Sequence, residues 1–241
     1  MFKLVALLVF ISKLSFATTI FDGELIVVHP SKHYHTNPDT IIATNKLIQK
    51  FDRSVMLYQY DPSDDPLWYA DLNLKNQVYV YSRSGENKLA LSAKSSSIEV
   101  TMAGGYLTSC LGRAIADVMA TFLKSKNLKT LKINLESSAI FTGHLEQNQS
   151  LVPNTPYAES ILDDSVDGLS FSEVLSVLNG DNKAYFAELL EIGFIKNAPM
   201  MIQFDYNYKI NVKLAGKLIL TDTYTYQGVK DSKNIIIEFT L

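Results

Sequence analysis

The stretch from Ile98 to Leu135 constrains the fold more than any other part of the chain. It opens with the segment Ile98 to Ala103, which ends at Gly104 and Gly105, and it closes with Leu131 to Leu135; apolar and polar residues alternate along most of both segments. Between these segments, apolar residues recur at the 3.6-residue spacing of a helix with one buried face. The pattern predicts a strand, a glycine turn, a helix and a second strand. Because such units connect parallel strands, it also predicts an α/β sheet.

Further strands are predicted on the N-terminal side of this unit. The run from Glu24 to His29 is almost continuously apolar, which is typical of a strand covered on both faces. Residues 54–60 and 77–81 are also predicted to be strands, and a helical stripe of apolar residues occupies 41–51. Residues 18–145 are therefore predicted to form a Rossmann-like α/β domain, with a mainly parallel sheet and flanking helices.

The remaining residues, 146–241, differ in character. A helical stretch is predicted first. It is followed by a β-rich C-terminal region whose segments are rich in Ile, Val, Tyr and Thr, at 200–208, 209–214, 217–226 and 234–241. These strands are predicted to be antiparallel, with a turn at Ala215 and Gly216.

Residues 1–17 have the layout of a secretory signal peptide. Lys3 precedes a short apolar run, and small residues at Ser15 and Ala17 favour cleavage after Ala17. The alternative is a buried N-terminal strand. The expected location is periplasmic or extracellular, and no other stretch approaches the roughly 20 apolar residues of a membrane helix. The net charge of -3 argues against a nucleic-acid partner that needs a broad basic surface.

The chain contains a single cysteine, Cys110, so no disulfide can form within it. Cys110 stands where the predicted helix begins. The partial positive charge and backbone N–H groups of a helix N-terminus stabilise a thiolate and can hold an oxyanion. Cys110 is therefore a candidate nucleophile. The alternative is that it fills space in the core as a small apolar residue.

The predicted strands bring other candidate residues towards Cys110. Ligands of open parallel sheets bind beyond the carboxyl ends of the strands. The residues expected at that edge are His29 and His33 as candidate bases, with the binding residues Asp61, Arg83, Gly104 and Gly105. Three histidines, His29, His33 and His35, fall within seven residues and could instead hold zinc.

The residues Gly104, Cys110, Leu111 and Asp117 resemble the cysteine region of isochorismatase-like hydrolases. In that family a strand ends in glycine and the nucleophilic cysteine follows six residues later, before an aliphatic residue and an aspartate seven positions after the cysteine. The resemblance covers roughly residues 20–135 and implies a parallel α/β sheet with Cys110 as nucleophile.

The chain departs from the family pattern at two positions. The family places a catalytic aspartate at the end of the first strand, where this chain has His29. The family lysine has Arg83 as its nearest candidate. These differences leave three functions open. They are a metal-independent cysteine hydrolase, a non-catalytic binding or interaction protein on a hydrolase scaffold, and a zinc-binding protein. No cofactor is expected for the first two, and the partner would be a small molecule or a protein.

Overall fold

The computed structural model describes six segments of the chain, 17–30, 38–58, 76–81, 89–107, 110–141 and 206–241. It also describes five single residues between the last two segments, which are Phe171, Leu175, Lys183, Phe186 and Ala187. The predicted signal peptide, apart from Ala17, lies outside the described residues, and so does most of the predicted helical stretch.

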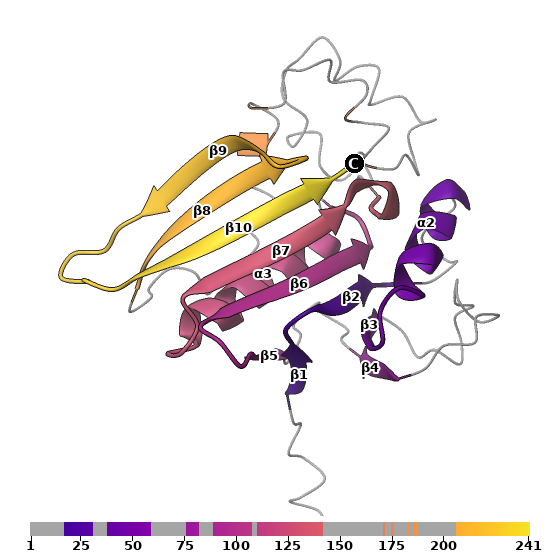
Figure 1. The fold of residues 1–241 in the computed structure, drawn as a ribbon, viewed down its shortest axis with the longest axis horizontal. Coiled ribbons are helices and arrows are strands. Elements are labelled where there is room, and N and C mark those ends of the chain that lie inside the picture. The colour runs from indigo at the N-terminus through magenta and orange to yellow at the C-terminus, as the bar shows by residue number, and fades with distance from the viewer. Residues whose placement is uncertain are drawn as a thin grey trace, which may run out of the picture.

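A single eight-stranded sheet dominates the described structure, in the order β4-β3-β2-β6-β7-β10-β8-β9 (Figure 1). The strands are β2 (Glu24–Val28), β3 (Ser54–Tyr58), β4 (Gln77–Tyr81), β6 (Ser97–Gly104), β7 (Thr130–Glu136), β8 (Asn207–Leu214), β9 (Lys217–Tyr224) and β10 (Ser232–Thr240). A separate parallel pair consists of β1 (Thr18–Phe21) and β5 (Leu89–Ser92). The α-helices with described bounds are α2 (Pro38–Ile48) and α3 (Cys110–Lys124), and a 3-10 turn, η1 (Ser137–Ala139), follows β7.

The predicted α/β class is confirmed, as a sheet-dominated fold with both parallel and antiparallel pairs. The prediction that the C-terminal strands are antiparallel is wrong except for the β8–β9 hairpin. That hairpin uses only one edge of β8, and its turn at Ala215 and Gly216 has left-handed φ angles of 47° and 80°. The chain then returns to the free edge of β8, so β10 runs parallel to both β8 and β7.

The β10 strand therefore joins the C-terminal strands to the sheet formed by the first part of the chain. The predicted separate strands at 200–208 and 209–214 are also wrong, because Asn207–Leu214 is one continuous strand. The β1 strand was not predicted at all. Its four residues are too few to show a periodicity.

Helices cover both faces of the sheet around β2. All five residues of β2 are buried. Its Ile26 and Val28 side chains belong to the cluster that includes the apolar face of α3. Leu25 and Val27 belong to the cluster formed with α2 on the opposite face. This arrangement explains the continuous apolar run that the sequence shows there.

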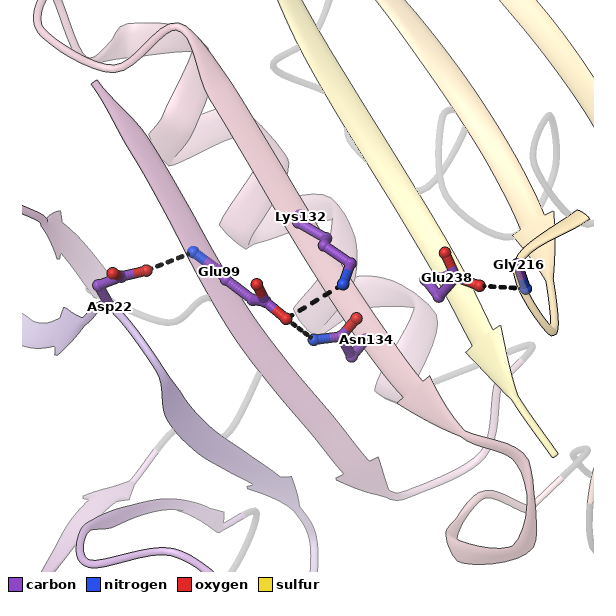
Figure 2. A network of polar contacts seen from close by, with 6 residues as sticks. All are labelled: Asp22, Glu99, Lys132, Asn134, Gly216 and Glu238. Atoms are coloured by element: carbon purple, nitrogen blue, oxygen red, sulfur yellow. Dashed lines mark hydrogen bonds and ion pairs between the residues drawn. The ribbon is translucent and has the colours of Figure 1, made fainter. Parts of the chain in front are cut away.

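Buried and less buried residues alternate strictly along both β7 and β10, unlike along β2. Every second residue packs on the α3 side, where Phe239 contacts the rings of Phe171 and Phe186 at centroid distances of 4.9 and 5.0 Å. The other face of these strands carries polar side chains, some of which Figure 2 shows. In this half of the sheet, one face is apolar and the other is polar.

A buried lysine connects the start of β10 to the end of α3. Lys233 is only 2% exposed, and its Nζ donates hydrogen bonds to the carbonyl oxygens of Phe122, at 2.8 Å, and Ser125. It also lies 4.2 Å from the ring centroid of Tyr206. Burial, with a smaller contribution from the charge of Lys129, lowers the pKa of Lys233 to about 8. The ammonium group thus caps the carbonyl end of the helix.

Candidate functional site

The carboxyl ends of β2 and β6 lie side by side, because Val28 pairs with Gly104 in the parallel ladder. The two strands therefore bring His29 and the glycine pair Gly104–Gly105 to one edge of the sheet. The β3 and β4 strands, which are parallel to β2, end at the same edge. The residues predicted to extend the site from there, which are His33, His35, Asp61 and Arg83, lie outside the described residues.

The glycine pair is required by the close approach of β2 and α3. Gly104 and Gly105 have left-handed φ angles of 70° and 62°. A Cβ atom on Gly104 would lie 2.6 Å from the carbonyl oxygen of Val28, and one on Gly105 would lie 3.0 Å from Sγ of Cys110. Only glycine lets the backbone turn here while the sulfur lies against the strand end.

Cys110 is the first residue of α3, as the sequence predicts. The backbone N–H of Tyr106 donates a hydrogen bond to its Sγ, with an N–S distance of 3.1 Å. The neighbouring backbone donors are also engaged, since Leu107 N–H donates to Phe141 and Leu111 N–H donates to Tyr106. These three N–H groups therefore do not point into an empty oxyanion site.

Burial raises the pKa of the Cys110 thiol. Backbone N–H groups of Tyr106 and Leu111, together with the positive charge of Arg113, act in the opposite direction but do not offset the desolvation. The pKa therefore moves against the direction expected from a helix N-terminus alone. The resting side chain is a neutral thiol at neutral pH.

His29 adopts a conformation that is unusual for a residue with a side chain. Its φ angle is 47°, in the left-handed region. Its N–H donates a 2.8 Å hydrogen bond to the carbonyl of Leu57, which fixes the end of β2 against β3. Such a conformation costs on the order of 1 kcal/mol or more and is found preferentially at functional sites.

An aromatic pair beside Cys110 was not predicted from the sequence. The rings of Tyr106 and Phe141 lie 5.8 Å apart between centroids, and Cys110 and Ile41 pack against them. Tyr106 and Phe141 also form a parallel bridge between the segments that follow β6 and β7. The signal that could have identified them is the occurrence of an aromatic residue soon after each of two adjacent strand ends.

The described residues contain no group of three or more His, Cys, Asp or Glu side chains that could hold a metal ion. Of the three histidines predicted as zinc ligands, only His29 is described, so the zinc alternative stays a prediction. Within the described part of the chain, no helix combines the length and apolar character needed to span a membrane.

The chain matches no family model, no curated protein and no solved structure among those compared with it. The resemblance to isochorismatase-like hydrolases depends on four residues. In the structure, Gly104 ends β6, Cys110 begins α3, and Leu111 and Asp117 lie on α3 as a buried and a half-buried residue.

Proposed function

We propose that this protein is an exported, metal-independent cysteine hydrolase that acts on a small molecule at the carboxyl edge of the sheet. The observation that carries the proposal is the hydrogen bond from Tyr106 N–H to Sγ of Cys110, which holds the sulfur beside the glycine turn. The parallel order of β3, β2, β6 and β7, with helices on both faces of β2, supports a Rossmann-like scaffold of the isochorismatase-like type.

In the proposed reaction, Cys110 attacks an acyl carbon of the substrate. Because the resting thiol is neutral, a base has to take its proton as the S–C bond forms. His29 is the proposed base, with His33 as the alternative, and the proton then passes to the leaving group. Water cleaves the resulting thioester, which releases the acid and regenerates the thiol. The strained backbone of His29 at the end of β2 supports this assignment.

A second function is favoured by the environment of the sulfur. The pKa of Cys110 is raised, and the N–H groups around it are already bound. Both features fit a non-catalytic binding protein that keeps the hydrolase scaffold, with Cys110 as a packing residue. The periplasmic or extracellular location rests on the signal-peptide pattern for either function.

Alkylation of Cys110 by iodoacetamide between pH 5 and 9 separates the two functions, because the chain has no other thiol. A hydrolase should react in the folded state, and His29→Asn should slow the reaction by about 100-fold or more at neutral pH, the range in which a general base acts. Asparagine tolerates the left-handed φ of position 29, so the backbone is preserved.

The second variant, His29→Gly, also accepts this φ angle and also lacks the imidazole ring. Both variants should therefore slow alkylation to the same extent. Reaction of Cys110 only after denaturation, or equal rates in the wild type and His29→Asn, would reject the hydrolase and leave the binding protein.

A further inference from the structure

Arg113 is the positively charged residue of α3 that lies nearest to Cys110. It follows the cysteine by three residues, and residues three apart on a helix are neighbours, with Cβ atoms about 5–6 Å apart. Long side chains on a helix lean towards its N-terminus, which for Arg113 is the turn that carries the sulfur. The positive charge of Arg113 acts on the Cys110 thiol in the direction that favours the thiolate. Arg113 therefore belongs to the surroundings of the candidate nucleophile.

The guanidinium group of Arg113 is available to a ligand. Arg113 is exposed, although the residues on either side of it in α3, Gly112 and Ala114, are buried. Among the described residues it makes no ion pair, and neither Asp39 on α2 nor Asp117 on α3 lies within ion-pair distance of it. A guanidinium group without a carboxylate partner can bind the carboxylate of a ligand through two parallel N–H···O bonds.

The N-termini of α2 and α3 lie at the same edge of the sheet, since α2 follows β2 and α3 follows β6. Ile41, in the first turn of α2, packs against the same aromatic pair as Cys110. A helix N-terminus carries partial positive charge, so both helices add to the positive charge of Arg113. Cys110 is only partly buried, so its sulfur is not sealed inside the core. The surroundings of the thiol therefore favour a ligand that carries a negative charge.

We infer that Arg113 selects the substrate of the Cys110 site by binding a carboxylate of the acyl group, close to the carbon that Cys110 attacks. The substrate class is then a small amide or ester whose acyl group carries a free carboxylate. The inference rests on the proposed hydrolase and specifies what that site accepts. Arg113 only holds the carboxylate, and the bonds are made and broken at Cys110 with His29 as the base.

Two alkylating reagents of nearly the same shape test the inference. Iodoacetate carries a carboxylate on the carbon that the sulfur attacks, whereas iodoacetamide carries a neutral amide there. Both transfer that carbon to the sulfur and release iodide. Because both react with the thiolate, the ratio of their rates does not depend on how much thiolate is present. Dividing this ratio by the same ratio for the denatured chain, whose single thiol is again Cys110, gives the preference for the anionic reagent.

The folded wild type should prefer iodoacetate by about fivefold or more, the effect of one charge pair in contact in water. Sodium chloride at about 0.5 M should reduce this preference by screening. Arg113→Gln should abolish it. Arg113→Lys should keep most of it, because the positive charge remains, and Arg113→Glu should turn it into a preference for iodoacetamide.

Lys124→Gln is the matched control, because it removes an exposed positive charge from the other end of α3, roughly 16 Å away along the helix axis. It should leave the preference unchanged, and circular dichroism should show that every variant is folded.

The outcomes separate the inference from the hydrolase. If Cys110 reacts in the folded state but shows no preference for iodoacetate, or a preference that survives Arg113→Gln, the inference is overturned and the hydrolase stands. An equal loss in Lys124→Gln would also overturn it, because the effect would then come from net charge. If neither reagent reacts with Cys110 before denaturation, the hydrolase is rejected, and the assignment of its substrate is rejected with it.

Discussion

Apart from β9, the strands in the two halves of the sheet run in the same direction, but helices cover the two halves differently. Around β2, helices α2 and α3 lie on opposite faces, and every residue of the strand is buried. Across β7 and β10, only the α3 side is apolar, and polar residues alternate with buried ones. Parallel pairing alone therefore does not require helices on both faces, since alternation of polar and apolar residues allows one face to be in contact with water.

The candidate site belongs to the half that is covered on both sides. His29 follows the end of β2, and Gly105 lies against Val28 and the sulfur of Cys110, where β2, β6 and α3 meet. Such surroundings hold a strained backbone in place and raise the pKa of the thiol through desolvation. The other half instead carries, on its outer face, polar and charged side chains that are exposed or half-buried.

Introducing a carboxylate into each half should give the largest contrast. Val27→Asp places a charge among the side chains of α2 and β6 and should cost about 3–5 kcal/mol, because no partner compensates the buried charge. Ile236→Asp, on the half-buried polar face, should cost about 1 kcal/mol. Urea unfolding followed by circular dichroism measures both. Equal losses would show that the two faces are covered to the same degree.

Two glycines with similar left-handed φ angles extend the comparison to the backbone. Gly104→Ala should cost about 3 kcal/mol, because its Cβ would meet the carbonyl oxygen of Val28 at 2.6 Å in addition to the strain. Gly216→Ala, in the β8–β9 turn, meets nothing within 4 Å and should cost only about 1 kcal/mol. Thermal unfolding ranks the two variants. The reverse ranking would contradict the close packing of β2 against β6.

The pH dependence of stability reports on Lys233. This residue lies near the start of β10 and bonds to carbonyl oxygens at the end of α3. Its pKa is about 8 in the folded protein and about 10.4 in the unfolded chain. Below pH 8 both states are charged, so the cost of burying the ammonium is fully present. As pH rises above 8, the folded state loses its proton first and this cost is removed.

Stability should therefore increase by about 1–2 kcal/mol between pH 7 and 9.5 through Lys233. The measurement is urea unfolding of the wild type and Lys233→Met at each pH. The methionine variant lacks the titrating group, so the difference between the two curves isolates its effect. A difference that stays constant with pH would mean that Lys233 has an ordinary pKa in the folded protein.

Several strands were predictable because their sequence patterns are local. The prediction for 77–81 coincides with β4, and the strand predicted at 217–226 contains β9. The position of β10 between β7 and β8 was not predictable, because strand order is set by which edge stays free after the hairpin forms. The isoleucines and the phenylalanine of 234–241 favour a strand, but they do not reveal which strand lies alongside.

The candidate site, like the strands, was predictable only where its sequence pattern is local or follows from the parallel topology. The glycine turn and the start of α3 at Cys110 follow from local spacing, and the proximity of His29 follows from parallel topology. The raised pKa of the thiol did not follow, because desolvation depends on residues such as Tyr106 and Phe141 that meet only in the folded chain. Lys233 was missed because a lysine at a strand start ordinarily indicates a solvated end.

The place of β10 in the sheet has a consequence for the order in which the chain can acquire structure. Both of its neighbours, β7 and β8, precede it during synthesis, and they do not pair with each other. Until β10 is present, the position between β7 and β8 is unfilled, and the β8–β9 hairpin is not joined to the rest of the sheet as it is in the final structure. Long-range parallel pairing of this kind slows folding, because the closure of large loops precedes the stabilising contacts. The sheet therefore cannot be completed until the β10 segment has been translated and can pair with both β7 and β8.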